Sequence, residues 1–517
     1  MATFLIGLVV LFVGAAIYGK FCEKVFGPDD RETPAYSKQD GVDYVPMREW
    51  KNSLINLLNI AGTGPIIGPI QGILFGPIAF ITIPIGNVIG GAMHDYFSGM
   101  ICLRDGGTQM PDMVRKYSNK GVFTVYQIFL SVLLLLVGAV FIYTPGDIAA
   151  TQVFGFSGAV NDPTTWIIYG VIFVYYLIAT VFPIDAIIGR IYPIFGAILL
   201  FSAVGVFIGL FVKGYPLLNL WDDWHGIAFD AWAVDAATGE QAAFSYGQYF
   251  DANHFIPIFF ITVACGAISG FHATQSPMMA RCITSEKQGR TIFYGAMVAE
   301  GVIALIWAAA GVTFYTNHGS LLDGMTGLTN AIAAGGAGDV VYQISTTLLG
   351  PVGGVLAMIG VIACPITSGD TAYRSARLTI ADWFHIDQAK VGPRAALSVP
   401  LLAVGAVIAL ALPWDVLWRY FSWANQTLAM IVLWTGAVFL HKFGYPPKAC
   451  FIAALPATFM SAVSVTYFFQ APECLGLSTA IAYPVGIVAA ALFLGIFIWR
   501  TLIVGKDDVA PLHAAKN

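Results

Sequence analysis

Two segments of the sequence combine glycine, proline and hydroxyl residues in a way that interrupts a helix. Residues 59–72 read NIAGTGPIIGPIQG, and residues 262–277 read TVACGAISGFHATQSP. Proline has no amide hydrogen, so Pro65 and Pro69 leave the carbonyls of Ala61 and Pro65 without their helical partners. In an apolar environment these groups need another partner, such as an ion, water or a polar side chain. Amides at the start of a half-helix also favour an anion such as a carboxylate.

Both breaks supply groups for a candidate substrate site. The expected site residues are small or hydrogen-bonding: Gly62, Thr63, Gly64, Gly266, Ser269, Gly270, His272 and Thr274. His272 could donate to a substrate carboxylate or titrate during transport. A buried histidine with both nitrogens satisfied is the alternative. Glycine recurs every fourth residue from 64 to 76, a spacing that also suits close packing of two helices.

Two acidic residues are candidates for proton coupling. Glu300 lies about nine residues into an apolar stretch, or about 13 Å deep at the rise of an α-helix. A charge at the centre of a bilayer costs about 2.5–3.5 kcal/mol or more, so such residues usually have a function. The alternative is a buried carboxyl hydrogen-bonded to a neighbouring helix. Asp95, beside His94, is the second candidate, although Arg104 and Arg115 follow closely enough to form an ion pair with it.

The composition places these residues in a membrane protein. Of the 517 residues, 57% are hydrophobic and only 11% are charged, whereas a soluble protein carries about a quarter charged residues. A span needs about 20 apolar residues. The stretches that meet this requirement predict an all-α integral membrane protein of about thirteen helices, near residues 2–20, 54–75, 77–101, 122–144, 165–183, 191–212, 255–276, 291–314, 345–368, 394–413, 420–440, 448–469 and 480–500.

The charges of the loops predict the orientation. Lys and Arg collect in loops 21–51 and 102–121 and in every second loop after them, whereas loop 213–254 is acidic. Basic loops face the cytoplasm. We therefore expect a multi-pass protein of the cell inner membrane with the N-terminus outside and the C-terminus in the cytoplasm.

The positions of the two breaks indicate an inverted repeat. One break runs from inside to outside and the other from outside to inside, and each opens a set of five spans, the arrangement of many transporter sites. The predicted units are 1–51, a first helix and cytoplasmic loop; 52–213, the first repeat; 214–254, the acidic loop; 255–440, the second repeat; and 441–517, two extra helices and a cytoplasmic tail.

The sequence resembles the carbon starvation protein (CstA) family. The resemblance is carried by Asp40–Pro46, Ala61–Pro69, Asp95, Arg104–Gly106, Thr262–Ala273, Glu300, Asp370, Arg374–Arg377 and Ala424–Leu428. It implies a secondary transporter of the amino acid–polyamine–organocation type with a LeuT-like five-plus-five core. Members of the family are linked to uptake of pyruvate, with protons, and of peptides.

The LeuT-like core also implies a candidate sodium site. In such folds the span after Pro365 supplies hydroxyls, here Thr367, Ser368 and Thr371, and the first broken helix supplies a carbonyl, here Ala61. Oxygen ligands suit a hard cation. Hydroxyls that bond back to their own helix are the alternative.

Further polar residues lie near these positions. Asp370 and Arg374 have the i,i+4 spacing of a helical salt bridge. Asn425 and Gln426 lie either on the access path or in hydrogen bonds between helices.

We therefore expect proton-coupled uptake of a small organic acid such as pyruvate, with sodium as the alternative coupling ion. Uptake of peptides or amino acids is the second hypothesis. An intramembrane enzyme is expected to carry a motif such as HExxH or GxSxG, and a channel is expected to carry a filter-like repeat. The sequence contains neither kind of motif. The seven cysteines lack metal-binding spacing and no basic run indicates nucleic acid, so we expect no cofactor, no metal and no nucleic-acid partner. The substrate and the bilayer are the expected partners, and the oligomeric state stays open.

Overall fold

The computed structural model describes residues 1–157, 162–181, 184–215, 217–226, 228–234, 241–318, 328–388, 390–412, 414–444 and 446–505. Its helices and strands are α1 (Ala2–Phe26), α2 (Pro34–Ser37), α3 (Glu49–Ile60), α4 (Gly64–Gly72), α5 (Ala79–Gly86), α6 (Ala92–Arg104), α7 (Met110–Tyr117), α8 (Lys120–Ile148), α9 (Pro163–Val181), α10 (Ile184–Val212), β1 (Ala228–Val234), β2 (Gln241–Ser245), α11 (Tyr246–Asn253), α12 (Phe255–Thr262), α13 (Ala264–Ala267), α14 (His272–Ala280), α15 (Gly295–His318), α16 (Leu328–Phe384), α17 (Val391–Ala411), α18 (Trp414–Phe443), α19 (Phe451–Gln470) and α20 (Thr479–Phe497). Parts of four predicted units lie outside the described residues, chiefly 158–161, 235–240, 319–327 and the tail from 506 onwards.

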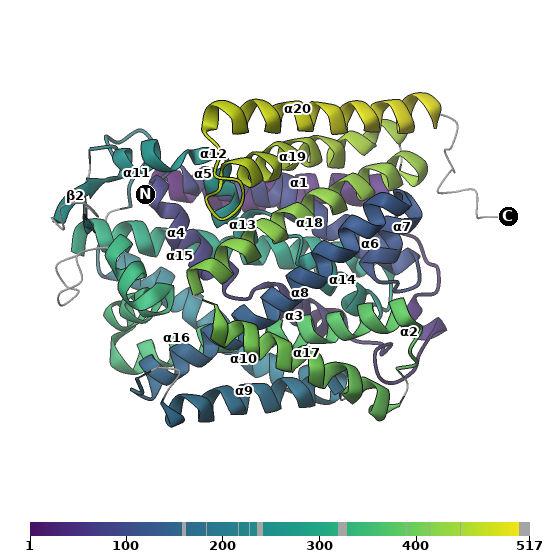
Figure 1. Cartoon of the computed structure of the whole chain (residues 1–517), viewed down its shortest axis with the longest axis horizontal. Coiled ribbons are helices and arrows are strands. Elements are labelled where there is room, and N and C mark those ends of the chain that lie inside the picture. Colours follow the sequence, from purple (N-terminus) through teal and green to yellow (C-terminus); the bar gives the residue numbers. More distant parts are fainter. Residues whose placement is uncertain are drawn as a thin grey trace.

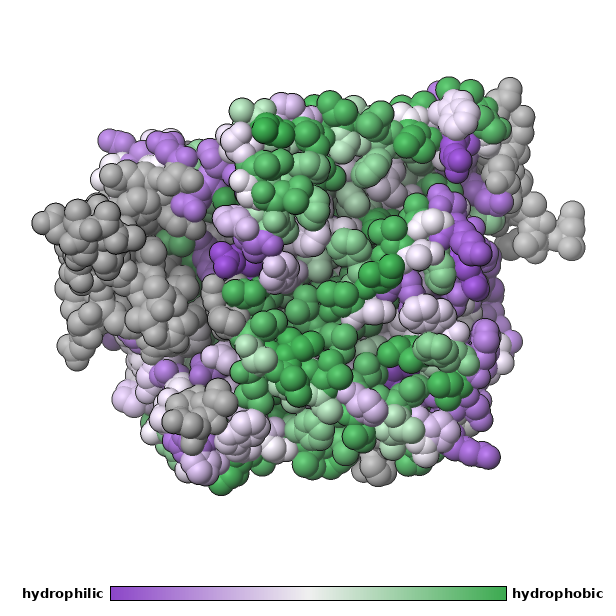
Figure 2. Space-filling model, in the orientation of Figure 1, coloured by the Kyte–Doolittle hydropathy of each residue, from purple (hydrophilic) through white to green (hydrophobic). Residues whose placement is uncertain are grey.

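Most helices run along one direction, and an apolar belt crosses the middle of the molecule between two polar ends (Figures 1 and 2). On the outermost helix, α20, Ile487 and Leu492 are 63% and 59% exposed. Large apolar side chains exposed in such a belt face lipid, because lipid replaces water there. The chain is therefore a multi-pass membrane protein built from helices.

Ten helices in the described ranges are long and apolar enough to cross a membrane, and the pair α3–α4, bent by 48°, would be an eleventh. The predicted spans 77–101 and 255–276 do not meet the same test. The first carries Asn87, His94 and Asp95 within it, and the second is divided into α12, α13 and α14, of 8, 4 and 9 residues. The count of thirteen spans stays a prediction.

Two elements differ from the expected pattern. The span predicted at 345–368 belongs to the much longer α16, in which Gly350 has a φ of 71° and precedes Pro351. A left-handed residue cannot continue a right-handed helix, so α16 is interrupted there. In the acidic loop, β1 and β2 pair as an antiparallel hairpin, the only sheet among the residues that the structure describes.

The two ends of the molecule carry different loops. The N-terminal ammonium group donates to the carbonyl of Leu217 at 2.6 Å and to Asn219 Oδ1 at 2.9 Å, at the start of the acidic loop. The basic loops meet at the opposite end, where α2 and α7 lie (Figure 1). The sequence thus predicted correctly that the N-terminus and the acidic loop share one end.

Candidate functional site

The two interrupted helices pack directly against each other through the glycine face of α4. A Cβ on Gly64 would collide with the side chain of Cys265, and one on Gly68 would lie 2.7 Å from the carbonyl oxygen of Thr262. Helix packing, one of the two roles considered for the glycine repeat, therefore accounts for these positions. The same packing brings the predicted halves of the site together.

The first break lies between Ile60 and Gly64. The carbonyl of Leu58 accepts hydrogen bonds from Thr367 Oγ1 at 3.0 Å and from Ser368 Oγ at 3.2 Å. These two hydroxyls therefore lie at the break, as the cation hypothesis expects, but the carbonyl that they contact is that of Leu58 and not of Ala61. Oxygens from α3 and α16 thus meet at one point.

The other predicted groups at this break are buried beside it. A Cβ on Gly62 would lie 3.1 Å from Ser368 Oγ. The Thr63 hydroxyl is fully buried without a hydrogen-bond partner. Thr371 Oγ1 donates to the carbonyls of Thr367 and Ser368 at 3.2 and 3.1 Å. The alternative of bonding back to the same helix therefore holds for Thr371, and also for Thr367, whose Oγ1 donates to the carbonyl of Cys364 at 2.8 Å.

Side-chain amides hold the backbone of the second break. Asn87 Nδ2 donates to the carbonyl of Gly266 at 3.1 Å, and Gln426 Nε2 donates to that of Ile268 at 3.1 Å. Asn425 Oδ1 accepts from the amide of Phe271 at 2.6 Å. Buried backbone groups need such partners. Asn425 and Gln426 thus make hydrogen bonds between helices, one of their two expected roles, and sequence reasoning missed Asn87.

Three more predicted residues lie in this region. Ser269 Oγ lies 3.0 Å from Asn425 Nδ2, and Gly270 packs so closely on α18 that a Cβ would collide with the carbonyl of Asn425. Thr274 Oγ1 donates to the carbonyl of Phe271 at 2.7 Å. The hydroxyl of Thr274 therefore satisfies its own helix.

Four buried titratable residues form a chain across α6, α14 and α15. Asp95 Oδ1 lies 2.8 Å from His94 Nδ1, and Asp95 Oδ2 lies 2.8 Å from His272 Nδ1. His272 Nε2 lies 3.5 Å from Glu300 Oε2. The side chains of all four are at most 3% exposed. The structure thus brings together His272, Glu300 and Asp95, which the sequence singled out separately.

The hydrogen bonds of this chain define where a proton can reside. An ionised Asp95 accepts through both oxygens, so each imidazole presents Nδ1–H to it. Nε2 of a neutral His272 is then an acceptor beside Glu300, whose buried carboxyl is stable as the protonated acid. Transfer of that proton to His272 gives an imidazolium between two carboxylates. Glu300 Oε2 and His272 Nε2 are not hydrogen-bonded at their 3.5 Å separation, so such a transfer needs the two groups to approach more closely.

The alternative in which Asp95 pairs with an arginine is wrong. Arg104 Nη2 binds Glu286 Oε2 at 2.9 Å, and Arg115 Nη2 binds Asp112 Oδ1 at 2.9 Å. Arg104 lies at the end of α6, more than two turns beyond Asp95, so the two side chains are directed to different parts of the molecule.

The predicted salt bridge between Asp370 and Arg374 is also wrong. Asp370 accepts hydrogen bonds from the hydroxyls of Tyr175 at 2.8 Å and Tyr192 at 2.7 Å. Arg374 Nη1 instead donates to Asp43 Oδ1 at 2.9 Å. Partners from other elements outcompete the i,i+4 contact, which is worth only about 0.2–0.5 kcal/mol on a helix surface.

The family profile described as carbon starvation protein CstA matches residues 1–155 and 142–323. A Haemophilus influenzae protein described as an uncharacterized membrane protein is 43% identical over 357 residues, covering 63% of this chain and 94% of that protein. The peptide transporter CstA of Campylobacter jejuni is 27% identical, covering 61% of this chain and 51% of its own length. The pyruvate/proton symporter BtsT of Escherichia coli is 27% identical, covering 53% and 43%. The match thus spans about half the length of these two transporters.

Solved transporter structures with a LeuT-like fold are similar in architecture. MhsT in complex with L-phenylalanine has a TM-score of 0.54 at 13% identity, covering 87% of this chain and 99% of that one. The manganese transporter of Eremococcus coleocola, in complex with an aromatic bis-isothiourea substituted compound, has a TM-score of 0.51 at 12% identity, covering 91% and 99%. At these identities the likeness shows the fold and leaves the substrate open.

Proposed function

Because the chain belongs to the carbon starvation protein CstA family, we propose that it takes up a small organic acid such as pyruvate together with protons. The named relatives are a peptide transporter and a pyruvate/proton symporter, and this chain is a secondary transporter as well. The substrate and the coupling ion are the proposal. No cofactor is invoked besides that ion.

The observation that carries proton coupling is the chain from His94 through Asp95 and His272 to Glu300. A proton-driven transporter needs a group whose charge changes with the gradient. Both Glu300 carboxylate oxygens are buried without a hydrogen-bond partner, so a charge there has no compensation except through His272. Loading and releasing a proton would change the charge beside the second break, where the substrate carboxylate is proposed to bind.

The proposed substrate site lies between the two breaks. We assign it to Gly62, Thr63 and Gly64 on one side and to Gly266, Ser269, Gly270 and His272 on the other, with Thr274 next in α14. Half-helix N-termini offer amide hydrogens to an anion. The unpartnered Thr63 hydroxyl and an imidazole able to become cationic suit a carboxylate.

Sodium coupling is the second candidate, and a separate observation favours it. Thr367 and Ser368 meet the Leu58 carbonyl at the first break, which is the kind of oxygen cluster that suits a hard cation. Uptake of a short peptide or an amino acid remains the alternative for the substrate, in keeping with the peptide transporters among its relatives.

The proposed orientation follows the loop charges. Under the positive-inside rule, the end with the basic loops faces the cytoplasm and the N-terminus lies outside, in the cell inner membrane. We also retain the inverted repeat of 52–213 and 255–440, with the extra helices outside it. The opposed broken helices that pack together in the core support this arrangement.

Uptake by proteoliposomes tests the proposal. Labelled pyruvate and labelled dialanine are offered under an imposed proton gradient or an imposed sodium gradient. The proposal expects accumulation of pyruvate with the proton gradient alone. Accumulation of neither solute, or of pyruvate only with sodium, would contradict it.

A further inference from the structure

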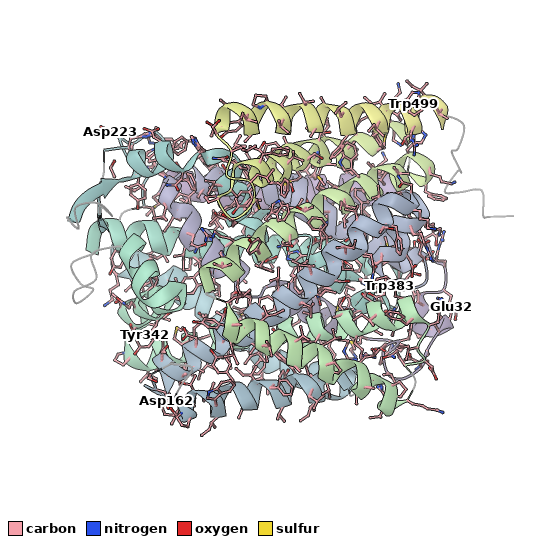
Figure 3. All side chains as sticks on the ribbon, viewed as in Figure 1. Glu32, Asp162, Asp223, Tyr342, Trp383 and Trp499 are labelled. Atoms are coloured by element: carbon pink, nitrogen blue, oxygen red, sulfur yellow. The ribbon has the colours of Figure 1, made fainter. Side chains whose placement is uncertain are left out.

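A solute-sized cavity lies away from the two breaks, at the end with the basic loops. It has a volume of about 520 Å³ and is lined by the ends of α14 and α16, by the start of α8 and by the loop before α7. Its rim includes the exposed Lys38 and Trp383. Trp383 lies toward the same end as Glu32 and opposite Asp223 (Figure 3). A cavity of this size accommodates a small organic solute.

The floor of the cavity holds polar atoms with no partner within the protein. Gln109, Gln127 and Thr379 line it and are only 2–4% exposed. The amide nitrogens of Gln109 and Gln127 and the hydroxyl of Thr379 are buried without a hydrogen bond. Leaving a buried polar group unsatisfied costs about 1–3 kcal/mol. Three of them, from three different elements, converge on one cavity, which indicates a ligand that accepts hydrogen bonds.

The charged side chains that line the cavity also bear on which ligand it prefers. Arg281 lines the cavity at 6% exposure, stacks on Tyr44 with its guanidinium 4.9 Å from the ring centroid, and donates through Nε to the carbonyl of Gly107 at 2.8 Å. This contact and the stacking on Tyr44 hold the guanidinium in place at the cavity. A planar guanidinium beside two amide donors matches a carboxylate. Asp112, Asp382 and Asp387 also line the cavity. Asp112 is paired with Arg115, and Asp382 could receive an ammonium group.

The same helices connect the cavity to the core of the molecule. In α14, Arg281 follows His272 by nine residues, or about 14 Å of helix. In α16, Thr367, Thr371, Ser375 and Thr379 recur every fourth residue on one buried face. Ser375 Oγ donates to the carbonyl of Thr274 at 3.1 Å. A stripe of hydroxyls thus runs from the first break to the floor of the cavity.

We propose that this cavity is a second binding site for the carboxylate of the transported solute, between the central site and the end with the basic loops. The proposal rests on the proposed transport function. The carboxylate is held by Gln109, Gln127, Thr379 and Arg281. Its source is either a 2-oxo acid or a short peptide, and Asp382 separates the two because only the peptide carries an ammonium group.

Calorimetric binding of pyruvate and of dialanine to the full chain in nanodiscs tests the site. Gln127→Leu with Thr379→Val removes two donors at nearly constant volume. Gln152→Leu with Thr458→Val is the control pair and makes the same two changes away from the cavity. Gln152 lies in the turn that follows α8, and Thr458 Oγ1 donates to a carbonyl of its own helix. We expect the first pair to raise the Kd of the solute that binds by at least about tenfold and the second to leave it within about twofold. Gln109→Leu is an independent variant should the first pair fold poorly.

The outcomes separate the site from the transport function. An unchanged Kd in Gln127→Leu/Thr379→Val and in Gln109→Leu, in protein that still transports, would overturn the second site alone. Absence of transport of both solutes by the wild type would refute the proposed function, while the binding comparison still decides the site. Asp382→Asn should weaken dialanine and spare pyruvate; equal effects on both would contradict the role of Asp382. His272→Ala should retain binding at the cavity, and loss of all binding would overturn a separate site.

Discussion

Two groups of buried carboxylates differ in the partners that they have. In the core, Asp95 and Glu300 contact imidazoles. At the end with the basic loops, Glu286 and Asp43 contact guanidinium groups. Imidazole gains and loses a proton near neutral pH, whereas arginine keeps its charge at any pH that a cell reaches. The first group can therefore take part in proton transfer, and the second can only hold a fixed charge pattern.

The fixed pairs tie loops to helices. Glu286 accepts from Arg104 Nε at 3.0 Å and from the backbone amide of Asp29 at 2.9 Å, which fastens the segment after α1. Asp43 fastens the same long loop to Arg374. Neither role needs the charge to change during transport. Burial alone thus does not identify a functional carboxylate; the chemistry of its partner does.

The largest expected effect on transport comes from Asp95→Asn. An amide cannot accept from both imidazoles as the carboxylate does, so one link of the proton chain is lost. We expect accumulation of substrate above its equilibrium level to disappear in proteoliposomes. Asp30→Asn is the control, because Asp30 is 81% exposed in its pair with Lys287. Full accumulation by Asp95→Asn would show that the charge of Asp95, like the charges of Glu286 and Asp43, has no part in proton transfer.

Arg104→Gln should act on stability and not on coupling. The side chains of Arg104 and Glu286 are 6% and 0% exposed, and removing one partner of a buried pair costs about 3–5 kcal/mol. We expect a lower thermal unfolding midpoint with an unchanged ratio of protons to substrate in the folded fraction. Arg115→Gln, at a side chain 63% exposed, should cost under about 1 kcal/mol. A changed ratio in Arg104→Gln would remove the distinction between the two groups.

The stability contributed by Asp43 should depend on pH in one direction. Burial raises the pKa of Asp43, but the charges of Arg374, Arg377 and Arg281 outweigh it and hold the pKa below its usual value of 3.8. A carboxyl with a lowered pKa stabilises the fold above its unfolded-state pKa, and this stabilisation is lost as the pH falls through the folded-state pKa. The unfolding midpoints of the wild type and Asp43→Asn should differ most at neutral pH, begin to approach each other below about pH 4, and converge only once the pH lies below the lowered pKa of Asp43. A difference between the two unfolding midpoints that grows as the pH falls would contradict the lowered pKa of Asp43.

The smallest effect on proton-driven uptake is expected for Thr367→Val with Ser368→Ala. These hydroxyls satisfy the Leu58 carbonyl, so their loss costs about 1–3 kcal/mol of stability. Proton-driven accumulation should stay within about threefold of the wild type once corrected for folded protein. If this double variant transports nothing and the wild type requires sodium, the coupling ion binds at the first break and the proton account is contradicted.

Local sequence features predicted part of this site. Proline and glycine mark the two breaks because they act on the backbone at their own positions, and Glu300 stands out because an acid within an apolar stretch is costly. The link of Asp95 to His272 could not be predicted, because His272 lies 177 residues away and only the packing of α6 on α14 brings it near. The spacing of Asp370 and Arg374 predicted a salt bridge wrongly for the same reason. Asp370 is bound by two tyrosines, and Arg374 by a loop carboxylate, all far away in the sequence. Asn87 and the floor of the cavity likewise become visible only once helices from both halves are in contact.

Proton movement by Glu300→Gln tests the central claim most directly. Glutamine cannot take up or release the proton that this carboxyl is proposed to exchange with His272, but it keeps the size of the side chain. The measurement is the pH inside proteoliposomes during substrate entry, read with a trapped indicator, alongside exchange of labelled for unlabelled substrate. The account predicts that Glu300→Gln exchanges substrate yet carries no protons and accumulates nothing under a proton gradient. Substrate-driven proton entry at the wild-type rate in Glu300→Gln would contradict it.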